Sequence, residues 1–458
     1  MFYKLFYIVV LNVLLSQSFF NNITGDQIGF QSARSLAIGN THFINSNTSV
    51  VAFRNPARLG NLNIKKNKLM FNEFGLHIDY SSAGSMYSER RSIDLKDFFG
   101  GFLTEGDYVS NNNFYNYHHF GFIFDINLNL LLTNLNAGVG VSHGPWSTLD
   151  YRYQEEVRGM EPSSELVRDP IRGYHIMEHG GTIDLTSLGF GFSISKLISV
   201  GASINYIHDG KYKYFLDVTQ VGSSSQHLAS VSSLDYEGEF KGDIFPSVSL
   251  ILNPKNIEVS IGYEKSAIVK DSDNFSISSS TGLPFYIYPE SSDGQVQFDP
   301  SDDMSSFINQ DFTLKHIDYF YIEKPERMKL GMNYKIGANK YSRLVSFEII
   351  KNIFSNSFFQ DCYEFNLGIE HVKYDKIFRA GLSYKESSLK TSYLSPLTTF
   401  SFGTSKKINK LIFDIAASYS YQRYQYHDLF PVSGDSRPDF DSVHESNWTL
   451  ISTLSYQF

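Results

Sequence analysis

The chain has 458 residues, of which 42% are hydrophobic and 16% aromatic, and its formal net charge is −9. An acidic balance without a long basic run argues against a nucleic-acid partner, and a single cysteine, Cys362, excludes a disulfide framework within the chain. Abundant Tyr, Phe, Gly, Asn and Ser without disulfides is typical of an exported outer-membrane β-barrel, whose aromatic residues gather at the two membrane interfaces. A secreted β-sandwich array is the alternative.

Residues 1–18 have the layout of a secretory signal peptide, with Lys4, an apolar run from Leu5 to Leu15, and small residues at Ser16 and Ser18. We expect cleavage near Ser18. No later stretch of the sequence approaches the roughly 18 consecutive apolar residues that a membrane helix needs. A helical inner-membrane protein is therefore not expected.

Residues 19–66 precede the first predicted strand and show no strand alternation. A connection of this length needs a place in the fold. The motif Asn55-Pro56-Ala57 favours a turn, and the apolar run from Val50 to Phe53 needs cover that the periplasm does not provide. We therefore expect this segment to fold as a plug in the lumen of a barrel.

From residue 67 to residue 458, apolar and polar residues alternate at the spacing of barrel strands. The pattern predicts about 14 strands, centred near 74, 122, 139, 190, 203, 247, 261, 332, 347, 367, 381, 401, 416 and 453. Tight turns are expected at Lys196-Leu197 and Asn253 to Asn256, and near Asn339, Asp375 and Asn409. Segments 84–117, 159–180, 268–322 and 428–444 are rich in Ser, Asp, Gly and Pro and are expected to be external loops. The predicted fold class is all-β, a transmembrane antiparallel barrel.

One predicted strand is interrupted at Gly144-Pro145 and then resumes through Leu149 and Tyr151. Proline removes a ladder donor and glycine weakens a strand, so a central strand should avoid both. Because an unpaired backbone group facing lipid costs several kcal/mol, we expect an inward kink at Gly144, Pro145 and Trp146 that opens a window in the wall. An ordinary bulge near the rim is the alternative.

The end of the sequence is a further strand, in which apolar residues from Trp448 to Phe458 alternate with Thr, Ser and Gln. A last strand that finishes on an aromatic residue is typical of the signal read by the barrel-assembly machinery. We therefore expect Tyr456 and Phe458 to be part of an assembly signal.

Several residues are candidates for ligand binding. Arg152 and Arg379 stand opposite the apolar parity of their strands and are expected to face the lumen, and Arg54 lies in the predicted plug. An inward cation could receive a ligand carboxylate, although ion pairs with Glu are the structural alternative. The long segment near 268–322 carries an apolar patch that includes Phe285 and Ile287. Such patches usually mark a binding surface, unless the loop packs on itself.

Metal and catalytic sites are not expected. The stretch "HIMEH", His175 to His179, matches the zinc motif H-x-x-E-H, but it lies between glycines in a predicted loop, with no helix and no evident third ligand. Acidic clusters at 271–274 and 299–303 are better explained as solvated loop than as calcium sites. No local pattern singles out a Ser-His-Asp triad of the outer-membrane phospholipase kind, so neither enzymatic activity nor a cofactor is expected.

Five stretches of the sequence resemble the FadL/OmpP1/TodX family of outer-membrane transporters for hydrophobic compounds. "ARSLAIGNTHFINSNTSVVAFRNPARL" is similar to the family's plug, and "GVSHGPWSTLDY" to its third strand. "FPSVSLILNPKNIEVSIGYEKSA", "KPERMKLGMNYKI" and "FRAGLSYKESSL" follow in family order. Arg58 stands where the family usually has Gly, and Asn40-Thr41 replaces a common Gly-Ala. The resemblance implies a barrel of 14 strands with a periplasmic plug, and a route for an apolar ligand from outer loops to a lumen pocket and sideways into the bilayer.

From these patterns we expect a protein of the bacterial outer membrane that takes up hydrophobic molecules passively, such as long-chain fatty acids. The ligand would bind in a partly apolar lumen pocket and leave at the kinked third strand. Outer-membrane lipid, lipopolysaccharide and the barrel-assembly machinery are the expected partners. The alternative is a barrel of the same fold that serves protein secretion as an accessory or scaffold.

Overall fold

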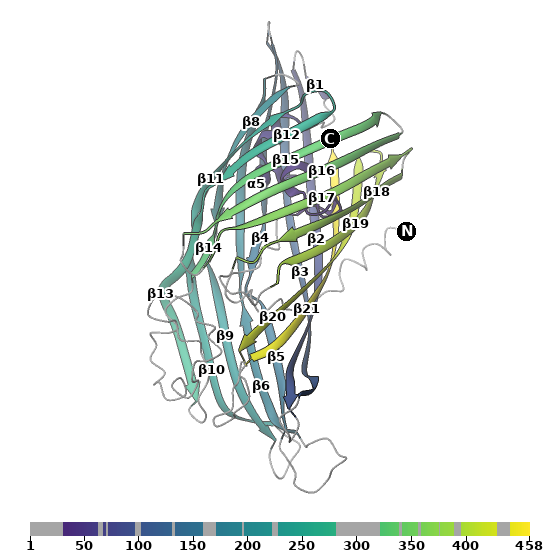
Figure 1. Ribbon diagram of the computed structural model, residues 1–458. Coiled ribbons are helices and arrows are strands. Elements are labelled where there is room, and N and C mark those ends of the chain that lie inside the picture. Colours follow the sequence, from purple (N-terminus) through teal and green to yellow (C-terminus); the bar gives the residue numbers. More distant parts are fainter. Residues whose placement is uncertain are drawn as a thin grey trace.

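Fourteen antiparallel strands close into a barrel in the computed structural model (Figure 1). The structure describes residues 31–62, 67–69, 72–96, 102–130, 133–158, 171–194, 197–221, 228–280, 321–338, 341–355, 359–374, 376–388, 395–427 and 440–458. The wall follows the order β2 (Asn72–Lys96), β3 (Phe102–Leu130), β4 (Thr133–Thr148), β7 (Thr182–Ser193), β8 (Ile198–Ile207), β11 (Ile244–Leu252), β12 (Ile257–Glu264), β15 (Glu326–Ala338), β16 (Tyr341–Ile353), β17 (Cys362–Lys373), β18 (Lys376–Lys385), β19 (Leu397–Ile408), β20 (Leu411–His427) and β21 (Phe440–Gln457). Strand β2 closes the ring because it pairs with both β3 and β21. The short β1 (Asn67–Leu69) pairs with the start of β2.

The strand predictions are confirmed, because every predicted centre falls within one of these wall strands. The outer surface explains why the pattern was readable. On β3, Phe120, Phe122 and Phe124 are exposed, whereas the intervening Ile123 and Asp125 are buried toward the lumen. Ladder hydrogen bonds pair the backbones of neighbouring wall strands, and the outward side chains form an apolar band. This architecture is that of a transmembrane β-barrel.

Six neighbouring wall strands continue beyond the barrel as a second sheet, which forms the lower end of the molecule in Figure 1. Its strands are β5 (Tyr151–Arg158), β6 (Ile171–Gly180), β9 (Gly210–Val221), β10 (Leu228–Lys241), β13 (Ala267–Ser280) and β14 (Tyr321–Lys324). Each is separated from its wall strand by one or two residues. We call this the second-sheet end, and the opposite end, which holds the turns near residues 196, 254, 339, 375 and 409, the tight-turn end.

The second sheet corrects the prediction that segments 159–180 and 268–322 are loops, because 171–180 and 267–280 are strands. Segment 84–117 likewise holds most of a long β2–β3 hairpin, and β21 begins within 428–444. These segments are polar on both faces, which on sequence alone predicts a loop. Beyond the apolar band, however, ladder hydrogen bonds satisfy the backbone whether or not the side chains are apolar.

Aspartate side chains bridge the breaks between wall and second sheet. The Gly181 amide donates to Asp150 Oδ1 at 2.9 Å, and the Ile268 amide donates to Asp243 Oδ2 at 3.0 Å. A third such bond joins the Gly242 amide to Asp209 Oδ1 at 2.8 Å. These carboxylates accept hydrogen bonds from backbone amides at the breaks, where ladder partners are missing.

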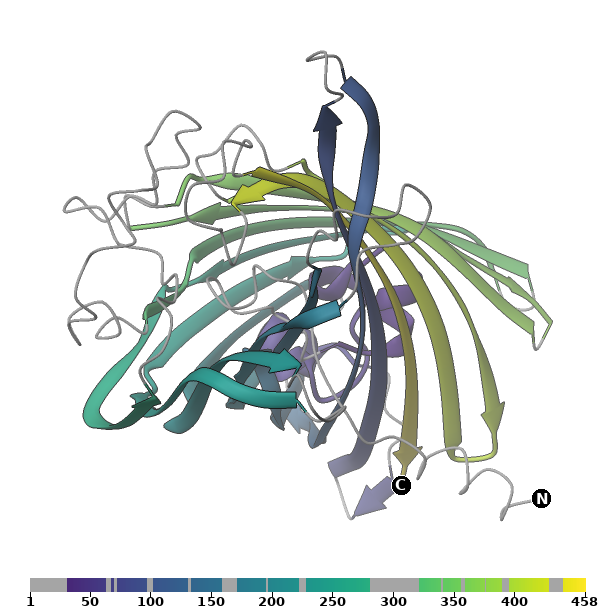
Figure 2. The ribbon, with the colours of Figure 1, turned by 90° about the horizontal axis from the view of Figure 1, so that it is seen from below.

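The segment before β1 fills the lumen, as predicted for a plug (Figure 2). Its elements are short: α3 (Ala33–Ala37), α4 (His42–Asn45), α5 (Val51–Arg54) and the 3-10 turn η1 (Pro56–Gly60). Ser32 caps α3 through its side chain. No helix in the described part of the chain is long and apolar enough to cross a membrane. Residues 1–30 lie outside the described residues, and so does the predicted signal peptide.

Wall glycines let the plug lie directly on the barrel backbone. A β-carbon at Gly201 would lie 2.2 Å from the Ala57 nitrogen, and one at Gly381 would lie 2.1 Å from the Gly39 nitrogen. Other wall glycines that face plug atoms within 3 Å are Gly121, Gly138, Gly140, Gly189, Gly191, Gly262, Gly331, Gly368 and Gly403. At Gly201 and Gly381 a side chain would collide with plug backbone rather than with a flexible tip. Plug and wall are therefore fitted to each other.

Candidate functional site

A cavity of about 280 Å³ lies in the lumen beside the plug. From the plug it is lined by Leu36, Asn40, His42, Phe43 and Arg54. The wall contributes mainly polar and charged side chains, among them Ser85, Arg327, Lys329, Glu348, Glu364, Lys385, Ser418 and Glu445. A partly apolar pocket was expected. The described cavity is partly apolar, with Leu36, Phe43, Ile350 and Leu397 among its apolar contacts beside the polar lining.

One side of the cavity concentrates positive charge around a single carboxylate. Glu264 is fully buried and pairs with Lys324 at 2.8 Å, with Lys329, and with Arg327 at 3.7 Å. Arg54, from plug helix α5, lies near this group, and its guanidinium stacks 4.8 Å from the Phe53 ring centroid. Burial and, to a smaller extent, repulsion from Arg327 lower the pKa of Arg54 to about 10, against the attraction of Glu264, Glu364 and Glu348. Glu348 and Glu364 also line the cavity and attract Arg54, so its lining mixes basic and acidic side chains, and Arg54, Arg327 and Lys329 are the groups there that an added anion would contact.

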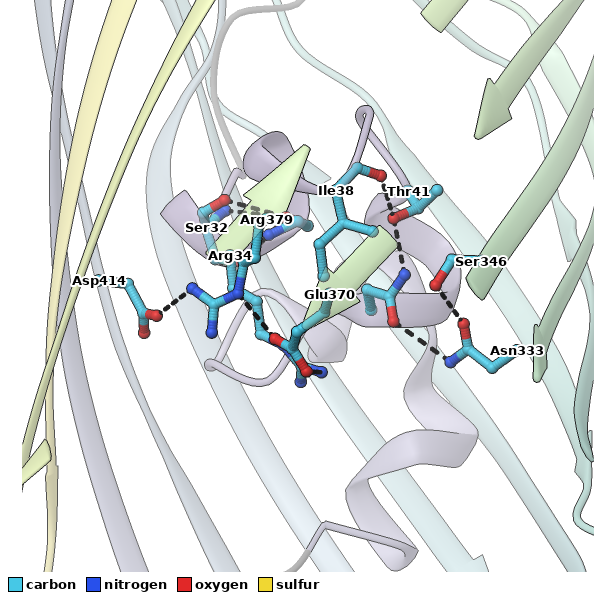
Figure 3. Close-up of polar contacts among 11 residues, drawn as sticks. Ser32, Arg34, Ile38, Thr41, Asn333, Ser346, Glu370, Arg379 and Asp414 are labelled. Atoms are coloured by element: carbon cyan, nitrogen blue, oxygen red, sulfur yellow. Dashed lines mark hydrogen bonds and ion pairs between the residues drawn. The ribbon is translucent and has the colours of Figure 1, made fainter. Parts of the chain in front are cut away.

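Arg379 lies in an ion-pair network that ties the plug to the wall (Figure 3). Its guanidinium contacts Glu370 at 2.7 Å and Asp414 at 2.6 Å. Glu370 also receives two hydrogen bonds of 3.1 Å from Arg34 of plug helix α3. Both oxygens of the Glu370 carboxylate therefore accept hydrogen bonds from arginine. Arg379 is not among the residues that line the cavity. This is the structural alternative to a ligand-binding role.

The prediction that Arg152 faces the lumen is wrong. Its side chain is 53% exposed and pairs with Glu178 at 3.0 Å, whereas Tyr151 and Tyr153 are buried. The prediction assumes that β5 is part of the lipid-facing wall, where Tyr151 and Tyr153 would point outward and Arg152 inward. Because β5 belongs to the second sheet, its aromatic face is the one that is covered.

The interruption at Gly144-Pro145 coincides with the end of pairing between β3 and β4. Phe120 and His143 are the last partners on that side, although β4 stays paired with β7 through Gly144–Leu185 and Pro145–Asp184. The β4–β7 register then shifts past Trp146. At this motif the structure shows a register shift opposite β7 and the end of ladder pairing with β3.

Trp146 turns inward at this separation. It is 1% exposed and packs in an apolar cluster with the plug residues Val50 and Phe53 and with Phe245. Farther along, β5 lies over the inner side of β2, where Tyr151 donates to Glu89 Oε2 at 2.9 Å. The Arg91 guanidinium stacks on the Tyr153 ring at 5.2 Å. The gap that β4 leaves beside β3 is therefore covered from within by β5.

The plug motif Asn55-Pro56-Ala57 forms the junction of α5 and η1. The Asn55 side-chain amide donates to the Phe43 carbonyl at 2.9 Å, and the Ala57 amide donates to Ser249 Oγ at 2.8 Å. Pro56 occupies the first turn of η1, where its missing N–H costs nothing. These bonds give the motif a structural role in holding the plug.

The remaining candidate residues lie apart from the cavity. Tyr456 and Phe458 stack edge to face at the tight-turn end, 4.5 Å between ring centroids, and the Phe458 amide donates to the Leu76 carbonyl at 2.9 Å. Phe285 and Ile287 lie outside the described residues. "HIMEH" lies on strand β6 rather than in a loop, which places His175 and His179 about 13 Å apart along the strand. The described residues contain no group of three potential metal ligands.

The fold of the chain is similar to that of a solved FadL homologue. A Pseudomonas aeruginosa FadL homologue superposes with a TM-score of 0.56 at 11% sequence identity, covering 94% of this chain and 99% of that chain. The chain has the FadL fold. The P. putida toluene transporter TodX (12% identity, 94% and 99% covered, TM-score 0.45) and the monoaromatic hydrocarbon channel CymD (11% identity, 96% and 98% covered, TM-score 0.46) are more distant in shape. No protein-family model and no curated protein matches the sequence.

Within this FadL-type barrel, the sequence analysis missed the basic cluster around Glu264. A signal for it was present, because Arg327 and Lys329 alternate with Met328 and Leu330 and so carry lumen parity on β15. Lys324 precedes this strand and had no periodic pattern to place it. Its burial against the Phe245 ring, 4.2 Å from the ring centroid, depends on the second sheet.

Proposed function

We propose that the protein is an outer-membrane channel for passive uptake of hydrophobic molecules that carry an acidic group, such as long-chain fatty acids. The observation that carries this proposal is the separation of β4 from β3 at Gly144 in a barrel whose lumen is otherwise plugged. The resemblance of the plug and third strand to the FadL/OmpP1/TodX family agrees with it. The second-sheet end faces the exterior, and the tight-turn end faces the periplasm. The role needs no catalytic residue, metal or cofactor.

The acidic group of the cargo pairs with the basic side of the cavity. Arg54, Arg327 and Lys329 line the cavity, and Arg327 and Lys329 share one carboxylate, Glu264. A carboxylate added there gains charge-assisted hydrogen bonds in a water-poor site. A pure hydrocarbon would bury this polar lining without replacing its hydration. The cavity therefore favours an amphipathic cargo over a hydrocarbon.

The cargo leaves sideways, between β3 and β4. An axial exit would have to displace the plug, whose backbone donors Phe43, Ile44 and Ser49 are held by Glu348 and Asp79 of the wall. Breaking buried charged hydrogen bonds of this kind costs about 1.5–3 kcal/mol each. The β3–β4 border has no ladder bonds beyond His143 to break. A lateral route therefore meets less resistance than an axial one.

A reversible lock tests the lateral route. In a Cys362→Ser background, His119→Cys with Gly144→Cys places cysteines where a Gly144 β-carbon would lie 2.8 Å from that of His119. Oxidation should stop uptake of a labelled fatty acid into cells, and reduction should restore it. The control pair is Ser187→Cys with Asn205→Cys, across the intact β7–β8 ladder, and it should transport in both states. Equal uptake by the oxidised lock and the oxidised control would rule out the lateral route.

The polar lining favours one alternative, a barrel of the same fold that acts as a secretion accessory or scaffold. Such a barrel needs no apolar path through its lumen. Mass spectrometry of lipids retained by the purified barrel separates the two. Long-chain acids retained by the parent and released by Lys329→Met support transport, whereas a barrel that retains none supports a scaffold.

A further inference from the structure

A shallow groove of about 650 Å³ hollows the outer face of the wall across β11, β12 and β15. Its outward side chains are Val248, Leu250, Ile261, Tyr263, Met328 and Leu330. Val248, Ile261 and Met328 are each 50% exposed and point away from the lumen. In a transmembrane barrel this surface faces hydrocarbon. A groove of this kind is shaped for an extended alkyl chain.

Three lysines lie beyond the groove, toward the second-sheet end. Lys265 follows Tyr263 by two residues, and Lys241 and Lys270 are directly opposed partners on β10 and β13. All three are exposed, and none forms an ion pair within the described residues. By contrast, Lys211 and Lys213 of the adjacent β9 pair with Glu239, Asp235 and Glu237. Like charges directly opposed on neighbouring strands are destabilising, so the unneutralised lysines call for an external anion.

The order of side chains along these strands sets the depth of the lysines. On β12 the outward positions run Ile261, Tyr263 and then Lys265. Tyrosine is enriched at the membrane interface, and basic residues just outside it meet lipid phosphates. The groove and the lysines therefore follow one another along the membrane normal, as do the acyl chain and the phosphorylated headgroup of a lipid.

We propose that this face binds one phosphorylated glycolipid of the outer leaflet, with an acyl chain in the groove, one phosphate on Lys265 and a second on the Lys241–Lys270 pair, about 16 Å farther along the strands. The inference rests on the outer-membrane placement proposed above, but not on transport. It assigns the lipid a position on the wall away from the β3–β4 border, separated from it by β7 and β8. A lipid at this site can stay bound while cargo passes.

Native mass spectrometry of the detergent-purified barrel tests the headgroup contact. Bis-phosphorylated lipid A should bind the parent about tenfold or more tighter than fully dephosphorylated lipid A. The variant Lys241→Ser, Lys265→Ser, Lys270→Ser should lose that preference. The control variant Lys373→Ser, Lys376→Ser, Lys407→Ser removes three exposed lysines at the tight-turn end and should keep it. Equal binding of the two lipids by the parent, or equal loss in both variants, would overturn the proposal.

Filling the groove tests the acyl contact. Val248→Phe with Ile261→Phe should weaken lipid A binding about fivefold or more, whereas Leu367→Phe with Leu382→Phe on β17 and β18 should not. Equal affinities in the two variants would reject the groove as the acyl site. Fatty-acid uptake is measured on the same proteins. Absence of uptake by the parent, with lipid A binding intact, would count against the proposed channel alone. Absence of lipid A binding by the parent, with normal uptake, would count against this site alone.

Discussion

Gly144 of β4 lies directly against His119 of β3, so that a β-carbon on Gly144 would be 2.8 Å from His119 Cβ and 3.0 Å from the His118 carbonyl oxygen. The two residues are neighbours without being ladder partners, because pairing of β3 with β4 ends at His143. Glycine is what permits this approach. The close contact marks the point at which β4 leaves the β3 ladder.

Replacing Gly144 by Val and Pro145 by Thr should abolish fatty-acid uptake while leaving a heat-modifiable barrel. Threonine restores an N–H at residue 145, and valine replaces the glycine that permits the kink, so β4 is expected to return to the β3 ladder. The control is Gly180→Val, because a β-carbon there meets only Asp150 Oδ1 at 3.7 Å. Normal uptake by the folded double variant would show that the separation of β3 and β4 has no part in transport.

Glu370→Gln should destabilise the plug by about 3 kcal/mol and raise the leak conductance of the barrel in planar bilayers. The substitution leaves Arg34 and Arg379 facing each other in a largely buried place. Its control is Glu178→Gln, which breaks the exposed pair with Arg152 and should cost under about 1 kcal/mol. Deleting residues 19–61 should raise conductance further. Unchanged conductance in both the deletion and Glu370→Gln would contradict the plug as a seal.

Arg54→Met should raise the dissociation constant of a long-chain carboxylate about tenfold, and leave that of the matching alcohol unchanged, as measured by calorimetry in detergent. Arg54 lines the cavity, and only the carboxylate gains from its charge. An equal loss for acid and alcohol would indicate that Arg54 shapes the cavity rather than pairs with the ligand.

Carboxylate binding by the parent should also be insensitive to pH up to about pH 9 and weaken above pH 10. Burial lowers the pKa of Arg54 to about 10, so the guanidinium is charged below that pH and loses its proton as the pH rises through it. Folding disfavours the charged form of a group whose pKa it lowers, so this arginine costs stability below pH 10 and the cost fades above it. Binding by Arg54→Met provides the reference, and its pH profile should lack the decline.

Removing Phe458 should lower the amount of barrel assembled in the outer membrane without changing the folding of purified protein in detergent. The ring packs on Tyr456 and its amide donates to Leu76, so loss of one residue perturbs the closed β2–β21 border only slightly. Phe458→Tyr, which keeps the aromatic ring, should assemble normally. Equal assembly of the deletion and of Phe458→Tyr would argue against a terminal recognition signal.

The sequence by itself determined the number and centres of the wall strands, because a strand that faces lipid on one side and the lumen on the other must alternate locally. It also located the break at Gly144-Pro145, because glycine and proline affect strand pairing locally. The plug before β1 was recognisable because the long segment 19–66 shows no strand alternation. The tertiary structure decided everything that depends on which surfaces meet. Arg152 is exposed because β5 leaves the wall for a second sheet, and Arg379 is occupied because plug helix α3 brings Arg34 to the same carboxylate. Lys324 is buried because β14, which ends at this residue, pairs with β13 and brings the side chain against Glu264 and Phe245. Contacts between residues hundreds of positions apart, such as the pair Arg34–Glu370, leave no periodic trace in either segment, and so the polarity of the cavity was set by the fold.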